Sequence, residues 1–286
     1  MKVLGIVSSP RKLGNSDMLT AELMNLLPPS WEKKMLRLTD LDIGSCSACY
    51  ACLPTGCDCR KQDDLNFFLQ EVKAADKFII AAPVYFLGPQ THIKLLTDRL
   101  LCILNDAKEY IKGKECVIVI PYGVKNWDGY AREATMNFAR LLGLKILGVR
   151  MIQGAIPGAV FTEQTQEDLL ALAQSLASGL LANTQDSNMV YCPSCHSSLL
   201  QIDKQNVWRC VICGAYGHWS IQNNQFTIVN ENPHERYTLE GLQEHGMLLT
   251  DIKDEFIQSR QAVKAVQKKY FKAYEWVSPH KKENEE

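Results

Sequence analysis

Short apolar runs rich in β-branched residues alternate with longer segments of helical periodicity over residues 2–182. This alternation is typical of a parallel sheet whose strands are joined by helices. The predicted strands are Val3–Val7, Lys34–Leu38, Lys77–Ala82, Cys116–Pro121 and Lys145–Ile152. The predicted helices are Ser16–Leu27, Asp63–Ala74, Gln90–Leu104, Tyr130–Leu142 and Gln164–Ala182. We therefore expect an α/β fold with a doubly wound, five-stranded parallel sheet.

The pattern changes after the polar stretch Asn183–Asn188, which shows no periodicity. We expect one domain over residues 1–182, a small metal-binding ribbon over 189–220 and a helical segment over 238–278. In the helical segment, apolar residues recur at steps of three and four, as in a heptad repeat. They are Leu249, Ile252, Phe256, Val263, Val266, Tyr270 and Val277. This stripe predicts a helix that packs either on its own chain or against a second copy of the chain.

The composition is that of an ordinary globular protein, with 46% hydrophobic residues among 286 and a net charge of −1. Near-neutral charge gives no support to a nucleic-acid-binding surface. The apolar run at the amino terminus is too short for a signal peptide, and no later run is long enough to span a membrane. We therefore expect a cytoplasmic protein with no membrane partner. Eleven cysteines in a reducing compartment then indicate metal or redox chemistry rather than disulfides.

A small polar turn, Ser8–Ser16, follows the first strand and leads directly into a helix. Such a junction presents free backbone N–H groups and the positive end of the helix dipole, which suits a phosphate. Its candidate ligand groups are those of Ser9, Arg11, Asn15 and Ser16. Because the turn lacks the fingerprints of a triphosphate or dinucleotide loop, we expect a mononucleotide. The alternative is that these side chains only cap the helix.

A second candidate loop follows the third strand and contains Pro83, Val84, Tyr85 and Phe86. Open parallel sheets bind ligands at the carboxyl ends of their strands, and the first and third strands flank such a position. One loop would then hold a phosphate while the other lines a flat ring. The alternative is that Tyr85 and Phe86 only cover the core.

Five cysteines lie between residues 46 and 59, at Cys46, Cys49, Cys52, Cys57 and Cys59. Thiolates at this compact spacing can converge on one metal centre, and we expect an iron–sulfur cluster. Zinc bound by four thiolates and free, oxidation-sensitive thiols are the two alternatives.

Two further pairs, Cys192/Cys195 and Cys210/Cys213, form two CxxC motifs with fourteen residues between them. This spacing is typical of a tetrahedral four-cysteine site on facing hairpins, holding zinc or, as in rubredoxin-like modules, a single iron. We expect Trp208, Tyr216 and Trp219 to form the small core around it. His196 and His218 are interpreted as bystanders because four cysteines already complete such a site.

These motifs together resemble the NADPH-dependent FMN reductase group of the flavodoxin-like superfamily, over residues 1–182. The resemblance is carried by Ser9-Pro10-Arg11, Gly14-Asn15-Ser16, Pro83-Val84-Tyr85-Phe86, Lys94 and Asp98-Arg99. It implies that the first turn binds the FMN phosphate, that the second loop lies against the isoalloxazine ring, and that Tyr122 and Gly123 complete the ring site. It also implies a homo-oligomer, since family members complete the flavin pocket with a neighbouring subunit.

The loop at residues 44–60 resembles that of iron–sulfur flavoproteins, a branch of the same group. This resemblance makes Cys59 the fourth ligand of a 4Fe-4S cluster with Cys46, Cys49 and Cys52, and Cys57 would also fit. We therefore expect an FMN-dependent oxidoreductase that moves electrons from NAD(P)H or a ferredoxin-like donor, through FMN and the cluster, to an unknown acceptor. No side chain is expected to act as an acid or base. The alternative function is a redox sensor or electron carrier that acts through a protein partner, with zinc in its cysteine sites.

Overall fold

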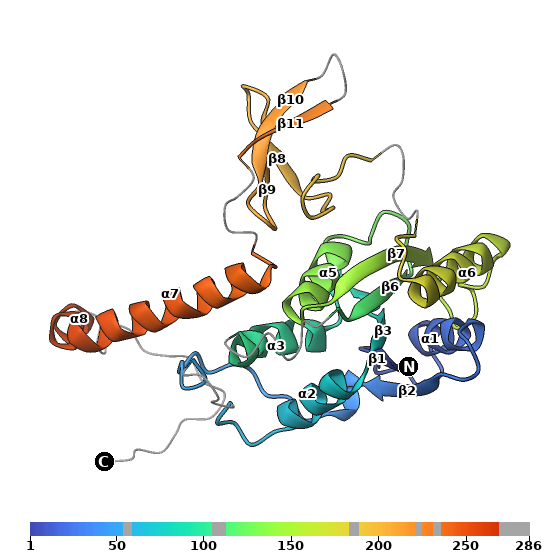
Figure 1. The fold of residues 1–286 in the computed structure, drawn as a ribbon, viewed down its shortest axis with the longest axis horizontal. Helices are drawn as coiled ribbons and strands as arrows, with labels where there is room; N and C mark the ends of the chain where they lie inside the picture. The colour runs from blue at the N-terminus through green and yellow to red at the C-terminus, as the bar shows by residue number, and fades with distance from the viewer. Residues whose placement is uncertain (54–58, 105–112, 183–188, 221–224, 231–235, 269–286) are drawn as a thin grey trace. The chain divides into compact units, whose positions relative to one another are not determined.

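The computed structural model of the chain describes residues 1–53, 59–104, 113–182, 189–220, 225–230 and 236–268 (Figure 1). The chain forms two compact units, Met1–Gly246 and Met247–Glu286. In the first unit, an α/β sandwich is followed by a small antiparallel sheet. Within the described part, no helix combines the length and hydropathy needed to cross a membrane.

The central sheet is five-stranded and parallel, with the order β2-β1-β3-β6-β7. Its strands are β1 Lys2–Val7, β2 Glu32–Arg37, β3 Lys77–Ala81, β6 Glu115–Tyr122 and β7 Lys145–Gln153. This confirms the predicted doubly wound α/β fold. Strands β1, β3 and β6 occupy the middle of the sheet and are buried almost throughout, because helices cover both faces.

Helices on the two faces of the sheet enclose two separate hydrophobic clusters (Figure 1). Helices α1 Asn15–Leu26 and α6 Glu163–Ser178 cover one face. The other face is covered by α2 Leu65–Ala74, α3 Thr91–Arg99 and α5 Ala131–Leu141. The carboxyl ends of β1, β3, β6 and β7 therefore meet at one uncovered edge, which is where the candidate loops begin.

Two of the predicted helices end several residues earlier than expected. The predicted helix Gln90–Leu104 ends at Arg99 and continues as the 3-10 turn η2 Leu100–Ile103. Helix α6 ends at Ser178 because Gly179 adopts a left-handed conformation with φ of 76°. Another short 3-10 turn, η1 Leu38–Asp40, follows β2.

The four paired cysteines lie in an antiparallel sheet of order β11-β10-β9-β8. Its strands are β8 Leu200–Ile202, β9 Val207–Cys210, β10 Tyr216–Ser220 and β11 Gln225–Asn230. We call this sheet and its cysteine turns the ribbon. Trp208 is fully buried in its core, with Trp219 packed beside it as expected. Tyr216, in contrast, is 39% exposed, and Tyr237 packs against the cluster instead.

The ribbon packs against α5, the helix that precedes β7. The buried carboxylate of Glu133 accepts hydrogen bonds from the backbone N–H (3.1 Å) and hydroxyl (2.8 Å) of Ser198. The Tyr237 hydroxyl donates to Oδ1 of Asn137 at 2.7 Å. Arg140 donates to the Cys195 carbonyl and stacks over the Tyr237 ring. Helix α5 therefore packs against both the central sheet and the ribbon.

Beyond the ribbon, the chain forms α7 Leu239–Gln258 and α8 Arg260–Lys268. Ile252, Phe256 and Val266 of the predicted stripe are about half exposed. Tyr270 and Val277 lie outside the described residues. The role of the stripe, in packing on its own chain or in oligomerisation, stays a prediction.

Candidate functional site

A pocket of about 220 Å³ lies at the carboxyl edge of the central sheet, between the loops that follow β1, β3, β6 and β7. Nine of the predicted cofactor-binding residues line it: Ser9, Arg11, Asn15, Ser16, Pro83, Val84, Tyr85, Tyr122 and Gly123. The tenth, Phe86, does not line the pocket and is 98% exposed. The structure thus brings together side chains from three loops that the sequence separates by more than a hundred residues.

The amino end of α1 offers unpaired donors to this pocket. Gly14 is the N-cap and supplies no side-chain hydrogen bond, so the first-turn amides have no capping partner. The hydroxyl oxygen of Ser16 is buried and has no hydrogen-bond partner among the described residues. A buried hydroxyl is costly when unpaired, and here it lies beside the positive end of a helix dipole. These groups fit the oxygens of a phosphate.

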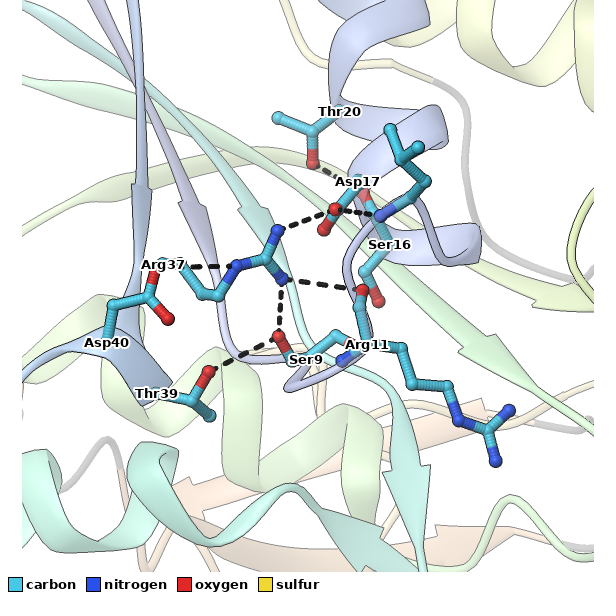
Figure 2. Close-up of polar contacts among 9 residues, drawn as sticks. Ser9, Arg11, Ser16, Asp17, Thr20, Arg37, Thr39 and Asp40 are labelled. Atoms are coloured by element: carbon cyan, nitrogen blue, oxygen red, sulfur yellow. Dashed lines mark hydrogen bonds and ion pairs between the residues drawn. The ribbon is translucent and has the colours of Figure 1, made fainter.

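Arg37, at the end of β2, contacts the turn after β1 and does not line the pocket (Figure 2). Its guanidinium donates to the Ser9 carbonyl and to Asp17 Oδ2, each at 2.6 Å. The same Asp17 oxygen accepts the N–H of Leu13 at 2.7 Å. The hydrogen bond with Asp17 raises the pKa of Arg37. Arg37 therefore fixes the turn and neutralises a carboxylate that would otherwise repel an anion at this helix end.

Asn15 closes the pocket by bridging the first turn to the loop after β7. Its amide nitrogen donates to the Gly154 carbonyl at 2.9 Å, and its oxygen accepts the N–H of Gly158 at 2.9 Å. Gly154 also donates to the Tyr122 carbonyl at 2.8 Å. Gly154, Ala155 and Pro157 line the pocket and were missed from the sequence. Gly154 and Pro157, directly after β7, could have predicted a turn at this position from the sequence.

The second candidate loop forms a hairpin of β4 Val84–Tyr85 and β5 Gly88–Pro89. Phe86 and Leu87 form its tip, with φ of 46° and 67°. Two successive left-handed residues are usual in hairpin turns, but Asn and Gly normally occupy these positions. The Leu87 carbonyl accepts the N–H of Tyr130 at 2.7 Å, so the strained tip is fixed to the residue that precedes α5.

Gly88 and Gly129 permit this close approach between the hairpin and the start of α5. A Cβ on Gly88 would lie 2.7 Å from the Tyr130 hydroxyl oxygen. One on Gly129 would lie 2.0 Å from the Leu87 carbonyl oxygen. The position of the hairpin beside the pocket therefore depends on two residues without side chains.

The loop at residues 44–60 presents thiols at several depths. Cys46 and Cys49 are exposed, Cys52 and Cys59 are half-buried, and Cys57 lies outside the described residues. The Cys46 sulfur accepts the N–H of Ala48 at 3.4 Å. A backbone hydrogen bond from Ala51 lowers the pKa of Cys49, whereas burial raises that of Cys52.

The backbone N–H that Ala48 directs at the Cys46 sulfur fits a centre held by thiolates. In the described ranges, the ribbon holds the only group of three or more cysteine sulfurs that lie within 4.8 Å of one another, which is a spacing for a single ion. The cysteines of a 4Fe-4S cluster bind four different irons and lie further apart. The assignment of a cluster to Cys46, Cys49, Cys52 and Cys59 stays a prediction.

In the ribbon, the four cysteines are buried and their sulfurs all lie within 4.8 Å of one another. Cys192 Sγ and Cys213 Sγ are 3.6 Å apart, and Cys195 Sγ and Cys210 Sγ are 3.5 Å apart. A tetrahedral ion with metal–sulfur bonds of about 2.3 Å would separate its sulfurs by about 3.8 Å. The predicted ligands are thus already at nearly the required spacing, and the site is compatible with metal binding.

The two CxxC turns have the same backbone pattern. The N–H of His196 donates to the Cys192 carbonyl at 2.8 Å, and that of Gly214 donates to the Cys210 carbonyl at 3.0 Å. His196 and Gly214 both have positive φ, of 56° and 82°. His196 and Gly214 therefore occupy equivalent positions in the two turns, and the interpretation of His196 as a bystander stays a prediction.

A second cavity, of about 380 Å³, lies at the opposite edge of the sheet, where the ribbon meets the starts of β6 and β7. Its lining includes Lys114, Arg140, Lys145 and Arg236, together with Cys195 and Cys213 of the ribbon. Four thiolates on one divalent ion carry a net charge of about −2. The cationic lining is therefore suited to offset the charge of a metal-loaded ribbon.

Residues 1–154 match the family model of NADPH-dependent FMN reductases. An iron-sulfur flavoprotein from Archaeoglobus fulgidus is 33% identical over 172 residues, covering 58% of this chain and 75% of that relative. An iron-sulfur flavoprotein from Methanocaldococcus jannaschii is 37% identical over 100 residues, which cover 35% of this chain and 51% of that relative. A solved flavone reductase superposes with a TM-score of 0.75 at 18% identity, covering 98% of this chain and all of that one. The fold of nearly the whole chain therefore has a solved counterpart.

Proposed function

Because this chain belongs to the NADPH-dependent FMN reductase family and is a flavin oxidoreductase, we propose that the pocket between the four sheet-edge loops binds FMN. The observation that carries this proposal is the partnerless, buried Ser16 hydroxyl at an uncapped helix start that lines the pocket. In this proposal, Ser9, Arg11, Asn15 and Ser16 bind the phosphate. Pro83, Val84, Tyr85, Tyr122 and Gly123 line the ring site, with Phe86 at its rim.

When bound, FMN would accept a hydride from NAD(P)H and release electrons singly, while an iron–sulfur cluster would store one electron at a time. The protein's own groups position the flavin and exclude water. Asn15 holds the first and fourth loops together, and the hairpin fixed by Tyr130 gives the ring site a rigid wall. None of these residues needs to transfer a proton, so we propose no acid or base.

Cys46, Cys49, Cys52 and Cys59 would hold a 4Fe-4S cluster, and the ribbon cysteines would hold zinc or a single iron. The compact spacing and sulfur-directed N–H groups of the loop support the first assignment. The converged sulfurs of the ribbon support the second. The donor is NAD(P)H or a ferredoxin-like protein, and the acceptor receives electrons from the flavin or the cluster. We further propose a cytoplasmic homo-oligomer.

Anaerobic purification followed by spectroscopy and elemental analysis tests the cofactors. We expect one FMN, about four irons and about one zinc per chain. A Ser16→Ala variant should bind FMN more weakly. Thr39→Ala should bind it as the native protein does, because Thr39 does not line the pocket and its hydrogen bond to the Ser9 carbonyl is long, at 3.5 Å. A colourless protein that does not take up added FMN would contradict the proposal.

Steady-state NAD(P)H oxidation, measured with and without an artificial acceptor, tests the reaction. We expect acceptor-dependent turnover with at least one nicotinamide. Negligible turnover in a protein that retains FMN would favour the alternative, a redox sensor or carrier supplied by another protein. Two zinc ions and no iron per chain would exclude the cluster but leave the flavin assignment intact.

A further inference from the structure

We propose that Arg99 is the positioning residue of the cysteine-loop centre, where it joins the two ends of the loop and raises the reduction potential of a bound cluster. This inference rests on the proposed 4Fe-4S cluster at Cys46, Cys49, Cys52 and Cys59. It adds a residue outside the loop, with a defined electrostatic effect on that site. Nothing in the cysteine spacing identifies this residue.

Arg99 is the last residue of α3, and its side chain is 1% exposed. Its Nη1 donates to the Gly44 carbonyl at 2.7 Å and to Asp63 Oδ2 at 2.6 Å. Its Nη2 donates to Asp63 Oδ1 at 3.1 Å and to Cys59 Sγ at 3.1 Å. A single buried guanidinium thus contacts the start of the loop, a proposed ligand and the segment after the loop.

Asp63 completes the connection from the other side. Its Oδ2 accepts the N–H of Gly44 at 3.1 Å, and its Oδ1 accepts the N–H of Leu65 at 3.3 Å. The Arg99 hydrogen bond lowers the pKa of Asp63, so this carboxylate is ionised at neutral pH. Both ends of the loop are therefore fixed to α2 and α3 by one buried, two-pronged ion pair.

The bond to sulfur gives Arg99 a role beyond bracing the fold. A 4Fe-4S cluster with four thiolate ligands is negatively charged and becomes more so when it gains an electron. Hydrogen bonds to its sulfurs and a nearby positive charge stabilise the reduced form more than the oxidised form, which raises the potential. Because the guanidinium is shielded from water, its charge is screened less than that of an exposed residue.

The chain supplies a matched control on the same helix. Lys94 pairs with Asp98 on the surface of α3, and its side chain is 72% exposed. Replacing Lys94 removes the same formal charge as replacing Arg99, but without contact to the loop. An effect of Arg99 that Lys94 does not share must therefore depend on its buried contacts.

The experiment compares the native protein with Arg99→Gln, Arg99→Lys, Lys94→Gln and the double variant Arg99→Gln/Asp63→Asn. The double variant leaves no unpaired buried carboxylate, so it keeps the test valid if the single Gln variant does not fold. Each protein is purified anaerobically, its FMN and iron are measured, and the cluster's potential is found by titration monitored by electron paramagnetic resonance.

We expect the equilibrium constant for cluster reduction to fall at least tenfold in Arg99→Gln, about 59 mV for one electron. It should fall by a smaller factor in the double variant, which loses the hydrogen bond to Cys59 but no net charge. Arg99→Lys keeps the charge without the two-pronged geometry. Its equilibrium constant for cluster reduction should lie between that of Arg99→Gln and that of the native protein. Lys94→Gln should match the native protein. Loss of iron from an Arg99 variant that retains FMN also supports the positioning role.

A double variant with native iron content and an unchanged potential would overturn the inference. Iron missing from the native protein would instead overturn the proposed cluster itself, before any variant is compared. The two failures are therefore distinguishable.

Discussion

Replacing Arg37 by methionine is the most informative perturbation of the proposed phosphate site. Methionine keeps much of the side-chain length but removes the charge that neutralises Asp17 and the donor that holds the Ser9 carbonyl (Figure 2). Arg37 faces the back of the turn and does not line the pocket. An effect on FMN would therefore act through Asp17 and the shape of the turn, rather than through a lost contact with the ligand.

The size of the effect follows from burial and charge. The side chains of Arg37 and Asp17 are 16% and 10% exposed, and their contact is 2.6 Å. Removing one partner of a largely buried pair costs about 3 kcal/mol of folding stability. A carboxylate and one phosphate charge separated by roughly 7 Å, at an effective dielectric constant of about 20, repel by about 2 kcal/mol. That repulsion corresponds to about a thirtyfold weaker affinity for FMN.

Two assays separate these effects. Urea unfolding of the FMN-free protein reports folding stability, and quenching of FMN fluorescence reports affinity. The matched variant is Arg37→Met/Asp17→Asn, in which neither charge remains. We expect Arg37→Met to weaken FMN binding about thirtyfold, and the double variant to recover most of that loss because the repelling carboxylate is gone.

The reasoning would be refuted if Arg37→Met bound FMN as tightly as the native protein. It would also be refuted if the double variant bound FMN no better than the single one, since the loss would then not come from the charge of Asp17.

Three further predictions concern the ribbon, the hairpin and the buried ion pair. His196→Gly should stabilise the metal-loaded ribbon by about 1 kcal/mol, because its positive φ of 56° strains any residue with a Cβ; a lower urea midpoint would contradict this. Phe86→Asn should raise the melting temperature by about 2–4 °C by relieving the hairpin tip, and calorimetry that shows no rise would argue against stored strain. Asp63→Asn should destabilise the protein at neutral pH and flatten its loss of stability in acid, measured by urea midpoints from about pH 6 to about pH 2. The reason is that Arg99 holds the folded-state pKa of Asp63 below its ordinary 3.8, so this stabilisation is complete above that value and is lost as the pH falls through the lowered pKa; equal slopes in both proteins would count against it.

The central sheet could be predicted from the sequence because its middle strands are buried on both faces. Every residue of β3 is buried, and an unbroken apolar run is the expected signal. The edge strand β2 begins at Glu32, two residues earlier than predicted, because its exposed charged residues carry no such signal. The hydrophobic pattern therefore predicts the bounds of a buried strand more accurately than those of an exposed edge strand.

The candidate site was predictable where its chemistry is local. Ser9, Asn15 and Ser16 belong to one turn, and the ribbon cysteines have a characteristic spacing. Arg37 was missed because it reaches the first turn from the neighbouring strand β2, and a lone arginine at a strand end has no distinctive pattern. Gly154 was missed because the pocket's fourth wall depends on the order of strands, which the sequence shows only indirectly.

Helix α5 has a practical implication for anyone who wishes to shorten this chain or graft its parts. A version that stops at residue 182 would remove the two Ser198 hydrogen bonds of Glu133, leaving it paired with Arg132, and would leave Asn137 without the Tyr237 hydroxyl. The same helix begins beside Tyr130, whose N–H holds the hairpin. The cut surface would thus lie one short helix away from the hairpin beside the pocket. A ribbon transferred from a relative should accordingly be taken together with that relative's α5.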